Sequence, residues 1–448
     1  MTSIDDPRDP AYLDEAEVRG ELSRVFEICH GCQQCVTLCT SFPTLFEMID
    51  RHDDRDPGRM TPADQDQVVD ECFHCGRCAI DCPFSPALGT PALGTPSLDE
   101  RNVDFPRLML RAEAMQFDTG IESARARSTT RLLGRTDRLG RLATRFSPIA
   151  NRIVGAEPGS LVRRVVQTVT GVSAARLLPL FARQRFSTWF ADRPTVTIIE
   201  PQGRVTIFAT CAVEYQEPGI GQDLVEVYER NGVECALSEG RCCGAPLLHG
   251  GDIAGFRRVA ERNVRTLAAE IRRGTDIVVP QPTCRSVLQH DAVRHAGGPD
   301  AELVAAHTFD ATEYLLGLHE GSDTALDTTF NGEIAAQITY HDSCHLQDRT
   351  SGEAGRRLLA LTGAWITPVE QSAGVDAMWG WRRGNEGVAV PIAAALGKQI
   401  EQANGDVVAG DSHLANTVIL EQTGRAPRHP LQVLARAYGI DPVERAGR

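Results

Sequence analysis

Cysteine is the residue type whose spacing in this 448-residue chain points most clearly to chemistry. Of its 14 cysteines, eight lie in two runs near the N-terminus. In each run three cysteines are separated by two residues, and a fourth follows after three more. Thiols stay reduced in the cytosol, so such clusters favour metal or redox chemistry over disulfides. The runs are Cys29, Cys32, Cys35 and Cys39, then Cys72, Cys75, Cys78 and Cys82, with Pro83 following.

This spacing is similar to that of bacterial two-cluster ferredoxins. Three thiolates two residues apart wrap one face of an iron–sulfur cube, and the fourth Cys reaches only the neighbouring cube. We therefore predict two [4Fe–4S] clusters. Zinc bound by Cys-x2-Cys pairs is the alternative, but it leaves the third Cys of each run unexplained. The predicted ligands are Cys29, Cys32, Cys35 and Cys82 for cluster 1, and Cys72, Cys75, Cys78 and Cys39 for cluster 2. His30 and His74 each lie beside a ligand, and we expect surface loop side chains there, with a role as ligands as the alternative.

The C-terminal half repeats a strand–helix–strand pattern, which indicates duplicated α/β modules with ligands on the loops at strand ends. In the first copy we expect strands at 205–211 and 276–279 and a helix at 256–273. In the second copy we expect strands at 337–344 and 406–409 and a helix at 388–402. The loop motifs are Cys242-Cys243-Gly244 and Gln281-Pro-Thr-Cys284 in the first copy, and Ser372-Ala373-Gly374 and Ser412-His-Leu-Ala415 in the second.

These motifs resemble the CCG modules of heterodisulfide reductases. A two-cluster module followed by two CCG modules looks like the iron–sulfur subunit of anaerobic glycerol-3-phosphate dehydrogenases. The segments around 26–46, 102–110 and Trp379-Gly380 look similar to the iron–sulfur proteins that accompany rubrerythrin-like diiron proteins. The resemblance implies a multi-cluster electron-transfer subunit. It also implies a mixed fold: an N-terminal α-helical two-cluster ferredoxin-type domain, a helical linker region and C-terminal duplicated α/β modules.

The departures from the CCG pattern decide which module can hold a cluster. The first module keeps Cys211, Cys242, Cys243 and Cys284, enough for a third cluster, although Gln281 replaces one Cys. A relic with reduced, buried thiols is the alternative. The second module keeps only Cys344, and Ser is a poor iron ligand because its hydroxyl stays protonated. We expect no cluster there. Cys235 is expected to be a core thiol.

Loop residues of the second copy pose a separate question. They would build a different metal or acid–base site if they converged, and solvated loop or core positions are the alternative. These residues are His341, Asp342, His345, Asp411 and His413.

The expected domains are residues 1–118 with two [4Fe–4S] clusters, an Arg-rich helical connector at 119–200, a first CCG module at 201–330 and a second, Cys-depleted module at 331–448. The tandem repeat at 86–96 reads as a linker. Between Arg131 and Phe146 an amphipathic helix places arginines opposite Leu132, Leu139 and Leu142. Such a helix docks on protein, which we favour here, or on an anionic membrane.

The composition narrows the range of possible functions. A net charge of −14 argues against nucleic acid as a partner, and no dinucleotide or phosphate-binding motif is present. The acidic, polar N-terminus predicts no secretory leader, hence a cytoplasmic protein, with peripheral membrane attachment left open. We expect an electron conduit between a flavoprotein dehydrogenase or a rubrerythrin-like diiron partner and an acceptor such as quinone. A thiol–disulfide reductase and a redox sensor are the alternatives. No catalytic residue is assigned.

Overall fold

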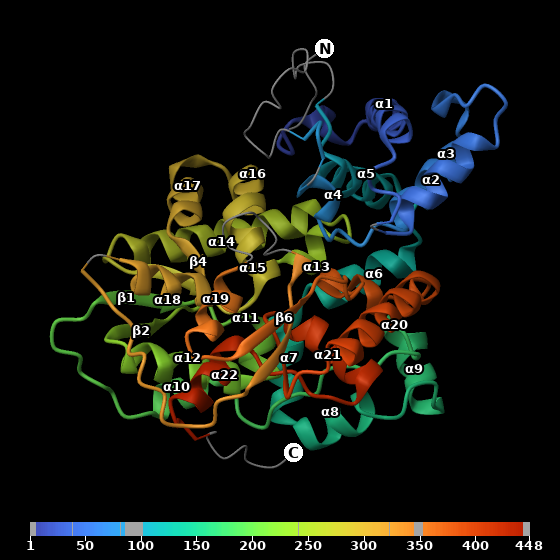
Figure 1. Ribbon diagram of the computed structural model, residues 1–448. Helices are drawn as coiled ribbons and strands as arrows, with labels where there is room; N and C mark the ends of the chain where they lie inside the picture. The colour runs from blue at the N-terminus through green and yellow to red at the C-terminus, as the bar shows by residue number, and fades with distance from the viewer. Residues whose placement is uncertain are drawn as a thin grey trace. The chain divides into compact units, whose positions relative to one another are not determined.

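The chain divides into two compact units, each described by itself. The N-terminal unit combines residues 1–131 with the segment Pro246–Gly255, and the α/β unit combines residues 132–245 with 256–448. The structure is a computed structural model, and it describes residues 6–37, 39–80, 82–85, 102–240, 242–321, 323–344 and 353–441 (Figure 1). The expected linker at 86–96 and His345 lie outside these residues.

The N-terminal unit is helical, and both cysteine runs emerge from its helix ends. Helix α1 starts at Asp14, whose side chain accepts the Glu17 N–H, and ends at Gln33 in the left-handed conformation. The apolar faces of α1, α2 and α5 form one core around Phe26, Phe42 and Phe105. The elements are η1 (Pro10–Leu13), α1 (Glu15–Cys32), α2 (Ser41–Asp50), η2 (Pro57–Arg59), α3 (Pro62–Asp70), α4 (Arg77–Ile80) and α5 (Phe105–Thr119).

The α/β unit contains two parallel sheets that share one hydrophobic core. The first sheet has the order β2-β1-β3-β4 and the second β6-β5-β7. In both, the first strand in the sequence is central, with the second on one side and the third on the other. Buried Ile207, Val278, Tyr340 and Ala409 join the two sheets into one cluster. The strands are β1 (Gly203–Ile207), β2 (Val233–Leu237), β3 (Asp276–Val279), β4 (Thr308–Asp310), β5 (Gln337–His341), β6 (Trp365–Val369) and β7 (Val407–Gly410).

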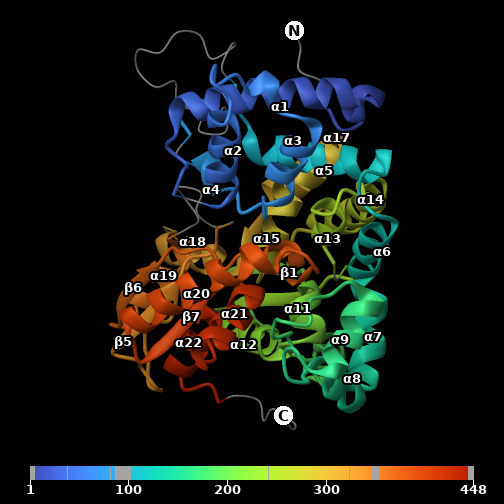
Figure 2. The same ribbon diagram turned by 90° about the vertical axis from the view of Figure 1, so that its right-hand side faces the viewer.

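Helices cover both sheets, and the expected long helices are confirmed as α14 and α20, with ends shifted by one to three residues. Helices α12 and α22 pack on each other, as do α20 and α21 (Figure 2). These helices and turns are α11 (Thr210–Tyr215), α12 (Pro218–Arg230), α13 (Ala245–Leu248), α14 (Ile253–Ile271), α15 (Pro282–Ser286), η4 (Val287–Asp291), α16 (Ala292–Ala296), α17 (Gly298–Ala306), α18 (Ala311–Glu320), α19 (Ala354–Ala360), η6 (Asp376–Trp381), α20 (Glu386–Ala403), α21 (His413–Thr423) and α22 (Pro430–Ala437).

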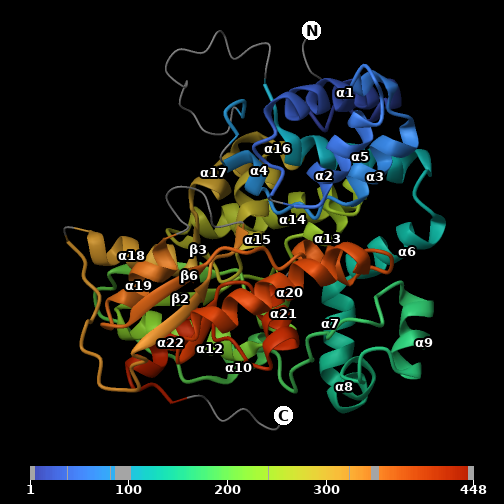
Figure 3. The same ribbon diagram turned by 45° about the vertical axis from the view of Figure 1, so that its right-hand side comes forward.

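The Arg-rich connector is helical, but the single helix expected between residues 131 and 146 is wrong. The chain turns at Gly134 and Arg135, which separate α6 from α7. Helix α7 packs on α11 through Gly140, where a Cβ would lie 2.4 Å from the Tyr215 ring. Helix α7 therefore docks through its small-residue face, and its large apolar side chains Leu139, Leu142 and Phe146 stay exposed. Helices α7, α8 and α9 follow one another in Figure 3. The connector helices are α6 (Ala124–Leu133), α7 (Thr136–Arg145), α8 (Ser147–Val154), α9 (Leu161–Thr170) and α10 (Phe186–Asp192).

Candidate iron–sulfur sites

The first predicted ligand set meets in the N-terminal unit. Cys29 and Cys32 lie in the last turn of α1, and Cys35 follows in the next turn. Burial raises the pKa of the Cys29 thiol, and Cys82, Cys35 and Cys32 raise it further through their proximity. Cys82 comes from the second run, yet it lies with the first three. The backbone N–H groups of Phe84 and Ser85 point to the Cys82 sulfur, and such N–H groups tune cluster potentials.

The second predicted set lines a small cavity in the same unit. Cys39, Cys72, Cys75 and Cys78 surround a space of about 20 Å³ together with Phe42 and Phe105. Burial and the neighbouring Cys72 raise the pKa of Cys39 to about 11. The pKa of the buried Cys78 is raised by burial, then by Cys72 and Cys39, and in addition by Cys35 and Cys29. The two sets of thiols are therefore close neighbours.

These thiols fit iron–sulfur clusters by their chemistry. In each set, neighbouring thiols help to raise the pKa of Cys29 and Cys82, or of Cys39 and Cys78, and binding of cationic iron removes that penalty by stabilising the thiolates. Among the described residues, no three His, Cys, Asp or Glu side chains converge tightly enough to hold a single metal ion. Thiolates are the ligands that [4Fe–4S] clusters take, so two neighbouring sets of four cysteines suit two such clusters.

A third group of thiols meets in the α/β unit, at the carboxyl ends of β1, β2 and β3. Burial raises the pKa of Cys211, and Cys242 and Cys243 add to the effect. Cys284 donates a hydrogen bond to Cys243, which raises the pKa of Cys284 and lowers that of Cys243. Thr210, buried with a φ of 66°, turns the chain directly before Cys211. All four cysteines that the sequence singles out in this module are thus brought together.

Gln281 takes a structural role where the CCG pattern has a cysteine. Its Nε2 donates to the carbonyl of Asp411 at 3.2 Å, and its Oε1 accepts the N–H of His413 at 3.0 Å. The side chain therefore joins the end of β3 to the end of β7. Cys235, in β2, packs partly buried against the core as expected.

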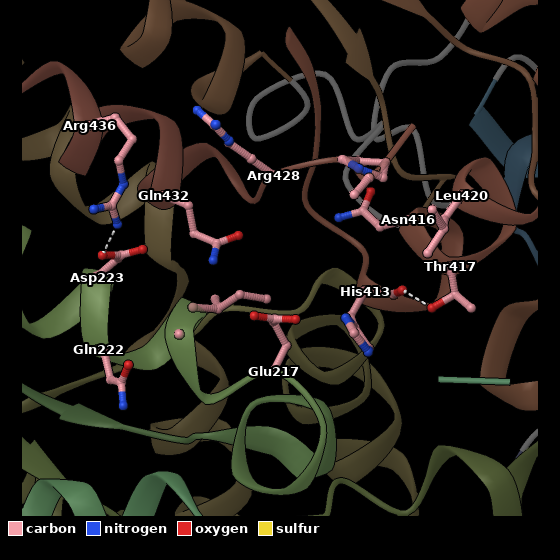
Figure 4. Close-up of a pocket in the computed structure, with 14 residues that line it drawn as sticks. Glu217, Gln222, Asp223, His413, Asn416, Thr417, Leu420, Arg428, Gln432 and Arg436 are labelled. Carbon is pink, nitrogen blue, oxygen red and sulfur yellow. Dashed lines mark hydrogen bonds and ion pairs between the residues drawn. The ribbon is translucent and has the colours of Figure 1, made fainter. Parts of the chain in front are cut away.

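The loop residues of the second sheet take separate partners. His341 Nε2 lies 3.0 Å from the carbonyl of Gln371, and Asp411 accepts a hydrogen bond of 2.7 Å from the hydroxyl of Tyr340. His413 instead lines a cavity of about 440 Å³ beside Glu217, opposite the ion pair of Asp223 and Arg436 (Figure 4). Burial lowers the pKa of His413, against the effect of Glu217. His413 thus faces a different cavity, whereas Asp342 lies close enough to Asp411 to help raise its pKa.

The expectation for the histidines beside the ligands holds for neither residue. His30 is mostly buried and lies 3.2 Å from Asp50, and its ring packs edge-on against Phe46. His74 is only 4% exposed, and its Nε2 lies 3.0 Å from Glu113 Oε2. Burial opposes its protonation, but Glu113 raises the pKa of His74 well above the ordinary value. No local pattern distinguishes such a residue from a surface histidine, because Glu113 is remote in the chain.

Two known domains match this chain. Residues 21–83 match the 4Fe-4S dicluster domain, and residues 205–289 match the Cysteine-rich domain named CCG. The chain is therefore an iron–sulfur protein with two [4Fe–4S] clusters in its N-terminal unit and a CCG domain in its α/β unit.

The similar proteins include subunits of two named enzymes and a lactate utilization protein. The chain is 27% identical over 329 residues to a subunit of the anaerobic glycerol-3-phosphate dehydrogenase of Escherichia coli, covering 71% of this chain and 81% of the relative. It is 28% identical over 177 residues to lactate utilization protein A of Shouchella clausii, covering 38% and 66%. It is 28% identical over 148 residues to a subunit of the fumarate reductase (CoM/CoB) of Methanothermobacter marburgensis, covering 33% and 26%.

Proposed function

We propose that the chain is the electron-transfer subunit of an oxidoreductase complex and that it carries three iron–sulfur clusters. The observation that carries this proposal is the gathering of twelve cysteines into three sets of four. Two sets lie in the N-terminal unit, and the third lies at the strand ends of the first sheet. Iron–sulfur clusters move single electrons, so a chain with several of them suits conduction.

The proposed donor is a flavoprotein dehydrogenase or a rubrerythrin-like diiron protein, and the proposed acceptor is a quinone. The similarity to a subunit of an anaerobic glycerol-3-phosphate dehydrogenase supports a dehydrogenase as the donor. The sequence contains no phosphate-binding motif that would bind a nucleotide cofactor able to carry hydride. The two-electron chemistry therefore belongs to a partner protein.

The second sheet is proposed to be a degenerate copy of the CCG module. Its strand order repeats that of the first three strands of the first sheet. The glycines of the two loop motifs, Gly244 and Gly374, both have positive φ, at 94° and 63°. In the degenerate copy, Ser372 uses its hydroxyl to accept the N–H of Gly374 at 3.2 Å. A hydroxyl committed to the local turn suits a structural loop without iron.

Iron and acid-labile sulfide in the anaerobically purified chain test the cluster count. We expect about 12 iron atoms per chain, four for each cluster. A content near 8 would leave only the N-terminal clusters and contradict the third. Stoichiometric zinc without iron would contradict all three. The matched variant is Cys243→Ser, in which the iron content should fall by about four atoms per chain.

We also propose that the connector attaches the complex peripherally to an anionic membrane. Within the described residues, no helix has the length and apolarity needed to cross a bilayer. Yet α7, α8 and α9 expose a row of large apolar side chains, here called the connector face. Large apolar side chains exposed on three consecutive helices suit an interaction site. The connector face comprises Leu142 (58% exposed), Phe146 (49%), Ile149 (64%), Leu161 (79%), Val165 (62%) and Val169 (79%).

The charged residues of the connector helices favour a membrane as the binding partner of the connector face. Exposed arginines from α7 to α9 are Arg138, Arg141, Arg145, Arg152 and Arg164. Glu157 is the only exposed acidic residue between residues 136 and 170, all of which the structure describes. A basic apolar face on a chain of net charge −14 suits an anionic bilayer.

Sedimentation with phosphatidylglycerol vesicles tests the membrane proposal. The double variant V165E/V169E should bind about a hundredfold more weakly, because two buried valines together contribute about 3 kcal/mol. The control is Ile199→Glu, since Ile199 is 88% exposed but lies outside the connector face. Absence of vesicle binding by the unchanged chain, or equal binding by the double variant, would indicate that this face docks on protein.

A further inference from the structure

The segment Pro246–Gly255 belongs to the N-terminal unit, although the sequence places it inside the first CCG module. Gly251 lets it approach α5 closely. Its φ is 77°, and a Cβ there would lie 2.5 Å from the carbonyl oxygen of Glu113 and 2.7 Å from Phe117 Cβ. Such contact with backbone leaves no room for a side chain. The segment is therefore fitted to α5 rather than loosely laid against it.

His249, in this segment, packs against His74. Both residues are 4% exposed, and their ring centroids are 4.9 Å apart with the planes tilted by 55°. His74 stands between Cys72 and Cys75, two predicted ligands of cluster 2, and it lines the cavity that those cysteines surround. Glu113 holds the His74 ring from the other side, at 3.0 Å from Nε2. The ring of His249 thus touches the immediate surroundings of cluster 2.

The same segment is covalently joined to the third set of thiols. His249 follows Cys243 by six residues. The chain between them spans at most about 22 Å even when fully extended. A buried contact at one end and a ligand at the other make this short stretch a continuous path through bonded or touching atoms. Electron tunnelling is faster through packed atoms than across gaps, so the path has a direct use.

We propose that the His74–His249 contact carries electrons between cluster 2 and the third cluster. The inference rests on the proposed third cluster. One electron leaves the cluster held by Cys39, Cys72, Cys75 and Cys78, which is oxidised, and reaches the cluster held by Cys211, Cys242, Cys243 and Cys284, which is reduced. No bond forms or breaks and no proton is transferred. The two imidazoles act as positioned, closely packed atoms and are not themselves oxidised or reduced.

Flash photoreduction of the anaerobically purified full chain, with freeze-quenched EPR at increasing times, measures this transfer. The variant His249→Leu should keep the parent's iron content but slow the arrival of the electron at the third cluster several-fold. His249→Phe, which keeps a packed ring, should retain most of the rate. Gly251→Ala should slow the transfer as His249→Leu does, because the added Cβ displaces the segment from α5.

A matched control removes another buried imidazole. His295 is 5% exposed and packs against the Phe256 ring at 5.0 Å, so His295→Leu should keep the parent rate. If His249→Leu kept both the iron content and the electron-transfer rate of the parent chain, the proposed route would be wrong. The proposed third cluster would not be affected by that result. A parent chain with about 8 iron and no third EPR signal would overturn the third cluster itself, and the route with it.

Discussion

Replacement of Cys82 by Ser is expected to remove cluster 1 and to spare cluster 2, although Cys82 belongs to the second cysteine run. Cys82 lies with Cys29, Cys32 and Cys35, whereas Cys39 from the first run lies with Cys72. A Ser hydroxyl stays protonated near neutral pH and does not replace the thiolate. The loss should be about four iron atoms and one of the cluster EPR signals.

Double variants test which cluster each cysteine serves. C82S/C29S should lose no more iron than Cys82→Ser, because both residues serve one cluster and their effects do not add. C82S/C39S should lose about eight iron atoms, because the two residues serve different clusters. The control Cys235→Ser should lose none, since Cys235 packs against the core of the α/β unit. If C82S/C72S lost only one cluster, each run would serve its own cluster and the exchange of fourth ligands would be wrong.

Removal of the Glu421 carboxylate is expected to destabilise the α/β unit by about 3–5 kcal/mol, because it leaves a buried arginine without its counter-charge. Arg176 is 1% exposed, and its Nε donates to Glu421 Oε2 at 2.9 Å. Glu421 Oε1 also accepts the N–H of Leu177 at 2.6 Å. This pair ties the connector to the C-terminal turn of α21. Glu421→Ala therefore removes a large part of an ordinary domain stability of about 5–15 kcal/mol.

Urea unfolding followed by tryptophan fluorescence measures this effect. All four tryptophans belong to the α/β unit, and Trp379 and Trp381 are buried, so the signal reports on that unit. The matched control is Glu234→Ala, which breaks a pair whose two side chains are each 56% exposed and should cost at most about 1 kcal/mol. The double variant R176M/E421L should recover most of the loss, because an apolar pair leaves no buried charge. If Glu421→Ala and Glu234→Ala lowered the free energy of unfolding equally, the buried pair would contribute no more to stability than the exposed pair.

The sequence by itself determined the chemistry of the protein and most of its strands. Ligand spacing is a local property, so the cysteine runs identified the two-cluster domain, which the match to residues 21–83 confirms. Strand β3 was located to the residue, and β5 and β7 to within one to three residues, because buried parallel strands are short apolar runs bounded by turns. The strand expected at 205–211 was wrong at its C-terminal end, because β1 ends at Ile207 and Cys211 lies in α11. The Cys242-Cys243-Gly244 motif likewise identified the CCG domain.

Only the tertiary structure decided which distant segments meet. His74 looked like a loop residue, and its burial against Glu113 and His249 depends on partners far along the chain. The segment 246–255 continues the CCG motif in sequence, yet it packs with the N-terminal unit because Gly251 lets it approach α5. Periodicity could not report the break between α6 and α7, since it records which face is apolar and not what covers that face. Contacts between remote residues depend on the packing of whole elements, and that information is not contained in any local stretch of sequence.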